Sequence, residues 1–96
     1  MPPFHWYLEG DRVVLNAYVL IKVASGHEKP VLSKLRELNN VDCADLVYGI
    51  YDIILKVSVK NVEELDDFVF GVIRQMEGVM ETMTCICSGG EKDESS

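Results

Sequence analysis

Two segments of the chain are rich in apolar and β-branched side chains that repeat with a period of two, and this pattern predicts β-strands. In residues 16–24 both alternating sets are largely apolar, so we expect a central strand that is covered on both faces. In residues 51–59 the alternation separates one apolar face from a mixed one. The apolar face carries Ile53, Leu55, Val57 and Val59, and the mixed face carries Asp52, Ile54, Lys56 and Ser58.

Two other segments have the helical period. Residues 28–38 place Val31, Leu32, Leu35 and Leu38 on one face, and Pro30 fits in the first turn, where a missing N–H is tolerated. Asn61 followed by Glu64 predicts a capping-box start for a second helix that runs to about Met76. Its apolar stripe consists of Leu65, Phe68, Val69, Val72, Ile73 and Met76.

Two weaker strands, at residues 41–48 and 79–87, complete the order β-α-β-β-α-β. Right-handed crossovers place both helices on one face of a four-stranded antiparallel sheet, which is the ferredoxin-like α+β sandwich. The opposite face then carries Tyr18, Leu20, Lys22, Ile54 and Lys56. Because this face is partly apolar and has no helix over it, we expect it to pack against a second copy of the chain.

We expect a single domain at residues 16–87, and the two ends of the chain have sequence patterns that differ from it. In residues 1–15, Phe4, Trp6 and Leu8 alternate with His5 and Tyr7, which predicts an extra strand or hairpin, or a strand that crosses to a partner. A frayed end is the alternative. Residues 88–96 hold no large apolar side chain, so we expect a disordered acidic tail.

Charge narrows the range of partners. The chain has 96 residues and a net charge of −7, so it should repel both a phosphate backbone and an anionic membrane surface. Nothing resembles a secretory signal, and a cytoplasmic location is expected, where Cys43, Cys85 and Cys87 stay reduced.

Few residues suggest catalytic or metal chemistry. Cys85 and Cys87 share one face of a strand, but no second ligand pair accompanies them, so we predict no metal site and no cofactor. His5 and His27 lie in different elements, and the chain contains no nucleophile elbow or phosphate-binding loop. We therefore do not expect an enzyme.

The segment Gly49-Ile50-Tyr51-Asp52 is the strongest candidate for a binding site. In one interpretation it is a plain hairpin, with Gly49 in a left-handed conformation. In the other, its backbone binds a ligand, and the Asp52 carboxylate meets an ammonium group. Thr82 and Thr84 share a strand face and are weaker candidates, although β-branched residues are common in strands for packing alone.

Three segments together resemble the effector domain of the Lrp/AsnC (feast/famine) transcription regulators, also called the RAM domain. They are residues 17–23 (AYVLIKV), residues 49–57 (GIYDIILKV), with the family's Gly-x-Tyr-Asp motif, and residues 78–84 (GVMETMT). The resemblance covers residues 16–87. It implies sheet-to-sheet dimers, rings such as octamers, and an amino acid bound between dimers near Gly49, Tyr51 and Asp52, with Thr82 and Thr84 less strongly implied.

Family members usually carry a helix-turn-helix before this domain, and 15 residues before Asn16 are too few for one. The resemblance therefore implies a stand-alone amino-acid-binding effector domain. It would act as a sensor, or as a co-regulator in hetero-oligomers with full-length relatives, without binding DNA itself. Two alternatives stay open, which are a small dimeric α+β barrel enzyme and a purely structural assembly subunit.

Overall fold

The computed structural model describes residues 14–87, so the expected N-terminal extension and acidic tail fall almost entirely outside the described part of the chain. The elements are β1 (Leu15–Val23), α1 (Glu28–Arg36), β2 (Val41–Leu46), β3 (Ile53–Val59), α2 (Val62–Gly71), the short 3-10 helix η2 (Ile73–Gln75) and β4 (Val79–Ile86). Among residues 14–87, no helix is long and apolar enough to span a bilayer.

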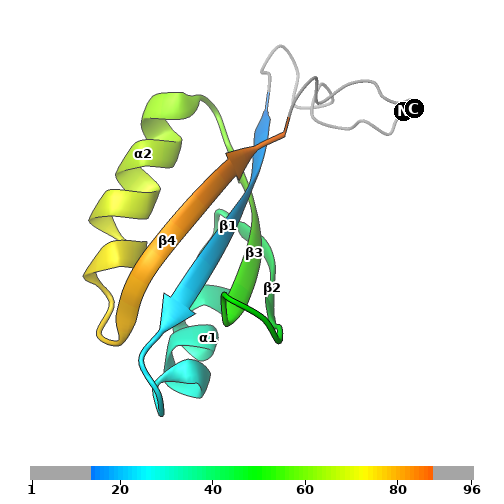
Figure 1. The fold of residues 1–96 in the computed structure, drawn as a ribbon. Helices are drawn as coiled ribbons and strands as arrows, with labels where there is room; N and C mark the ends of the chain where they lie inside the picture. Colours follow the sequence, from blue (N-terminus) through cyan, green and yellow to red (C-terminus); the bar gives the residue numbers. More distant parts are fainter. Residues whose placement is uncertain (1–13, 88–96) are drawn as a thin grey trace.

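The four strands form one antiparallel sheet in the order β2-β3-β1-β4, with β1 and β3 in the centre (Figure 1). Each helix connects two strands that are not neighbours within the sheet. This topology confirms the predicted ferredoxin-like α+β fold and places β2 and β4 at the two edges.

One face of the sheet forms the hydrophobic core with both helices. Alternate residues of β1 and β3 are buried on this face, and α1 and α2 add three buried residues each. Because both helices contribute to a single cluster, they cover the same face. The cluster consists of Ala17, Val19, Ile21, Val23, Val31, Leu32, Leu35, Ala44, Ile53, Leu55, Val57, Val59, Leu65, Phe68, Val69 and Ile73.

In the part of the chain that the structure describes, no helix covers the other face of the sheet. Tyr18 is 39% exposed, and Leu20, Lys22, Ile54 and Lys56 are only partly buried. The prediction that these five side chains share a face is confirmed by their register. The prediction that β1 is covered on both faces is wrong for a single copy of residues 14–87, because both helices of this part pack on the same face.

The helix starts agree with prediction better than the helix ends. The side chain of Asn61 accepts the N–H of Glu64 at 2.8 Å, and the Glu64 carboxylate accepts the N–H of Lys60 at 2.6 Å. However, α1 ends at Arg36 rather than residue 38, and α2 ends at Gly71 rather than near Met76. The Gln75 side chain donates to the carbonyl of Phe70 at 3.0 Å, which satisfies one of the carbonyl groups freed at the end of α2.

Two loops meet at one corner of the domain, beside the C-terminal end of β1. Gly78, just before β4, has φ +100°, and its carbonyl accepts the N–H of Ala24 at 2.8 Å. A Cβ at this position would lie 2.6 Å from the Cβ of His27. Gly78 is therefore required both by its backbone conformation and by the close approach of His27.

Candidate ligand-binding site

The segment between β2 and β3 is a loop anchored to the sheet. Val47 donates its N–H to the carbonyl of Asp52 at 2.9 Å and so closes residues 47–52. Gly49 has φ +151°, a conformation that disfavours other residues, and open space surrounds the position of a Cβ. The strands therefore stop at Leu46 and start again at Ile53, whereas strands over residues 41–48 and 51–59 were predicted.

Asp52 fastens this loop to the end of β1. Its N–H donates to the carbonyl of Ile21 at 2.9 Å, and its Oδ2 accepts the N–H of Val23 at 2.8 Å. Lys22 adds a third bond, from Nζ to the carbonyl of Ile50 at 3.1 Å. The carboxylate predicted to meet a ligand thus already holds the backbone through one oxygen. Among the hydrogen bonds of residues 14–87, Oδ1 of Asp52 has no partner.

The outer part of the loop is apolar and exposed. Tyr48 is fully exposed and Ile50 is 78% exposed, while Tyr51 is half-buried beside Asp52. A polar anchor and an apolar tip therefore lie within a few residues of each other. This combination suits a small ligand that has both a charged and an apolar end.

Thr82 and Thr84 lie on β4, on the opposite side of β1 from the loop. Thr82 pairs with Ile21, which in turn pairs with Ile53, the residue after Asp52. Thr84 pairs with Val19, two pairs farther along the sheet. Two strand spacings, about 10 Å, separate Thr82 from β3. The single chain brings Gly49, Tyr51 and Asp52 together but does not bring the threonines into contact with them.

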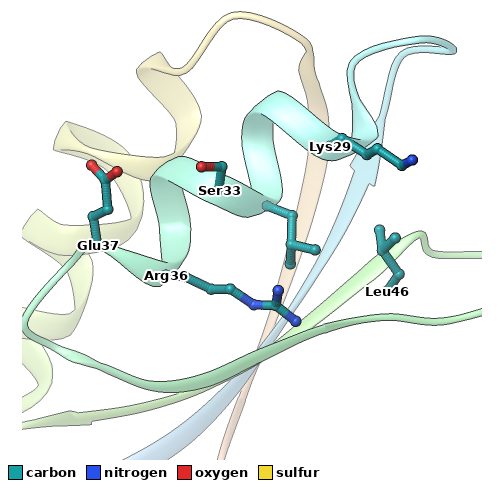
Figure 2. Close-up of a pocket in the computed structure, with 6 residues that line it drawn as sticks. Lys29, Ser33, Arg36, Glu37 and Leu46 are labelled. Carbon is teal, nitrogen blue, oxygen red and sulfur yellow. The ribbon is translucent and has the colours of Figure 1, made fainter.

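A groove that the sequence did not predict lies between α1 and β2. It has a volume of about 540 Å³ and is lined by Lys29, Leu32, Ser33, Arg36, Glu37 and Leu46. Figure 2 shows Arg36 extending from α1 toward the neighbouring strand, where its Nε and one terminal nitrogen donate to the carbonyl of Ala44 at 3.0 and 2.9 Å. Arg36 therefore has a structural role in joining α1 to β2, and the groove contains none of the predicted site residues.

Cysteines and histidines do not cluster in the described chain. Cys43, Cys85 and Cys87 are free thiols, and residues 14–87 contain no group of three or more His, Cys, Asp or Glu side chains placed to hold a metal ion. His27 packs against Gly78 instead.

The fold and this loop define a small α+β domain with a ferredoxin-like sheet, whose second face no helix of residues 14–87 covers. The chain belongs to the Lrp/AsnC ligand-binding domain family, whose model matches residues 16–96. This finding confirms the resemblance in the sequence. The family is one of transcription regulators and not of enzymes, so the alternative of a barrel enzyme is wrong.

Relatives in sequence are regulators of the helix-turn-helix type. An uncharacterised regulator from Pyrococcus furiosus is 33% identical over 76 residues, which are 79% of this chain and 51% of that protein. The regulator FL11 of the same organism is 37% identical over 70 residues, 73% of this chain and 46% of the relative. The chain spans about half the length of the curated relatives it matches.

Solved structures include proteins of similar size to this chain. FFRP-DM1 is 37% identical, with a TM-score of 0.74, over 76% of this chain and 97% of that one. TTHA0845 from Thermus thermophilus is 36% identical, also with a TM-score of 0.74, over 76% of this chain and 91% of that one. AsnC of E. coli shares the fold at 22% identity, with a TM-score of 0.76, over 85% of this chain and 54% of that one.

Proposed function

We propose that this chain is an effector domain that assembles with copies of itself and binds a free amino acid at the 47–52 loop. Its membership in the Lrp/AsnC ligand-binding domain family, over residues 16–96, is the observation that carries the proposal. A regulator from Neisseria meningitidis with the same fold, 14% identical and with a TM-score of 0.73 over 85% of this chain and 53% of that one, was solved as a complex with L-Met. The chemistry of the loop supports the same class of ligand.

Assembly follows from the uncovered face of the sheet. Its centre carries Leu20 and Ile54, which pair with each other across β1 and β3, and the exposed Tyr18 and Met83 lie nearby. Burying this surface against a second copy removes apolar area from water, which is the main driving force of association. A two-fold dimer uses the same patch twice, and the mixed composition of the face suits such a contact.

An amino acid presents an ammonium group, a carboxylate and a side chain within a few ångströms. Oδ1 of Asp52 is available to the ammonium group, and exposed backbone N–H groups of the loop can donate to the carboxylate. Tyr48 and Ile50 offer apolar surface to the ligand's side chain. Since these groups lie on the surface of one copy, we expect a neighbouring copy to complete the site and to exclude water from it.

Regulation would then act through assembly. A ligand held between dimers stabilises one oligomer over another, and a coupling of about 1–3 kcal/mol is enough to shift that balance. Ring-shaped assemblies such as octamers, and mixed assemblies with full-length relatives, are two forms this can take. The net charge of −7 favours contact with DNA through such a partner rather than through this domain, and we expect the complex to act in the cytoplasm.

The proposal is tested by titrating each of the twenty amino acids in a calorimeter, with light scattering to follow mass. For the ligand that binds, Asp52→Asn should weaken affinity about tenfold, because the amide keeps an acceptor for the N–H of Val23 but loses the charge that meets the ammonium. The dimer and the free energy of unfolding should change little.

Asp66→Asn is the matched control, because Asp66 is an exposed acid on α2, outside the loop and away from the uncovered face of the sheet. It should leave affinity unchanged. Binding of no amino acid by an assembled protein would contradict the proposal and favour a purely structural assembly subunit. Equal losses in the two variants would instead show that only overall charge matters.

A further inference from the structure

One row of side chains crosses the uncovered face from edge to edge. Cys43 on β2 pairs with Lys56 on β3, Lys56 pairs with Tyr18 on β1, and Tyr18 pairs with Cys85 on β4. The two thiols therefore lie at opposite ends of one row, three strand spacings or about 14 Å apart. Both cysteines are exposed and free, and they are too far apart to bond within one chain.

A β-bulge places Cys43 on this face. The register between β2 and β3 shifts between Val41, which pairs with Val57, and Cys43, which pairs with Lys56. Without the extra residue, Cys43 would pair with Leu55 and would face the helices. The bulge therefore puts one thiol at each edge of the uncovered face, and both thiols lie in the same row of paired residues.

The proposed dimer brings these thiols together if its two-fold axis runs parallel to the strands, between β3 and β1. Each residue then faces the one at the mirrored position in the row, so Cys43 faces Cys85 of the second copy at both edges. In the middle of the row, Lys56 faces the ring of Tyr18, a favourable cation–aromatic contact. In the next row Ile54 faces Leu20.

A two-fold axis across the strands is less favourable. With the axis through this row, each residue would face its own copy, and two Lys56 ammonium groups would meet at the centre of a closed interface. The axis along the strands also places the unpaired edge of β2 beside the unpaired edge of β4 of the second copy, which protects both edges.

We propose that Cys43 and Cys85 form an oxidisable thiol pair across the interface between two copies, twice in each dimer. This inference rests on the sheet-to-sheet dimer of the proposed function. A disulfide needs Cα atoms about 4.4–6.8 Å apart, closer than the ~10 Å between the centres of two packed sheets. The pair therefore requires the edges of the two sheets to curl toward each other, as the strands of a closing barrel do.

A small-molecule disulfide such as oxidised glutathione serves as the oxidant. The Cys43 thiolate attacks one of its sulfurs, which forms a mixed disulfide and releases one glutathione thiolate. The Cys85 thiolate of the second copy then attacks the Cys43 sulfur and releases the second glutathione thiolate. Each bridge passes two electrons to glutathione, and the two thiol protons end on the two glutathione thiols, so that two bridges link the dimer covalently.

The experiment uses the full chain with Cys87→Ser as the background, so that only the proposed pair can react. Oxidation with oxidised glutathione should give a covalent dimer on a non-reducing gel, and dithiothreitol should reverse it. Adding Cys43→Ala or Cys85→Ala to this background should abolish the covalent dimer. When these two variants are co-expressed, about half of the protein should cross-link, because only the mixed dimer has a Cys43 facing a Cys85.

Other results would overturn the pairing. A covalent dimer from either variant alone would show that like cysteines meet, and so that the axis runs across the strands. A dimer by light scattering that does not cross-link would refute the thiol pair and leave the proposed function standing. A monomer at all concentrations would refute the proposed assembly itself.

Discussion

The two faces of the sheet are made by the same strands but serve different purposes. On β3, Ile53, Leu55, Val57 and Val59 are almost completely buried under the helices, while Ile54, Lys56 and Ser58 between them stay partly exposed. The helix-covered face contains only apolar side chains in the core cluster. The uncovered face mixes apolar, charged and thiol groups, so it can bind a partner specifically, which an all-apolar face cannot do.

The largest expected effect is on the helix-covered face. Leu55→Ala removes a fully buried side chain from the centre of the core and should lower the free energy of unfolding by about 2–5 kcal/mol in urea denaturation. Its neighbour Ile54 provides the control. At dilutions where the chain is monomeric, Ile54→Ala should lower the free energy of unfolding clearly less than Leu55→Ala does. Equal losses of stability in the two variants would contradict the division between the faces.

The next effect should appear in assembly. Leu20→Asp puts a charge at the centre of the uncovered face and should raise the dimer dissociation constant at least about 100-fold, since burying an unpaired charge costs several kcal/mol. Analytical ultracentrifugation measures this change. Val62→Asp, at a half-exposed site where α2 begins, adds the same charge elsewhere and should leave the dimer intact; weakening by both variants would mean that the face is not the contact.

The smallest effect concerns the polar end of the uncovered face. The Ser58 hydroxyl lies 3.0 Å from Oδ1 of Asn16 and 2.5 Å from Oδ2 of Asp42, and it can donate its one proton to either. Ser58→Ala should lower the free energy of unfolding by about 1 kcal/mol, because both acceptors stay solvated. Thermal unfolding measures the loss, and Ser33→Ala, on the exposed side of α1, should have no comparable effect. A loss as large as that of Leu55→Ala would contradict the view that this end adds little stability.

Sequence periodicity predicted the fold because burial determines it. The alternation from Ile53 to Val59 and the stripe beginning at Leu65 are local patterns that reflect which side faces the core. The end of α2 was missed because Val72 and Ile73 continue the apolar pattern through a 3-10 turn, in which Gln75 donates its N–H to the carbonyl three residues back rather than four. Periodicity does not distinguish these two kinds of turn.

The site was predictable only in part. The Gly49 turn follows from glycine's conformational freedom, and its φ is indeed positive. The bond from the Val23 N–H to Asp52 joins residues 29 positions apart, and the contact of Arg36 with Ala44 depends on how α1 packs on β2. No local pattern contains such contacts. The distance between Thr82 and the loop likewise depends on strand order.

The corner formed by His27 and Gly78 has a consequence for how the domain can change. The residue before α1 and the residue before β4 lie side by side. The side chain of His27 therefore occupies the space that a side chain at Gly78 would need. A larger residue at 78 would force that ring out, and with it the segment that leads into α1. Because the nearest atom to a side chain at 78 is the Cβ of His27, alanine at 27 would still clash, and only a glycine at 27 would leave room for a side chain at 78.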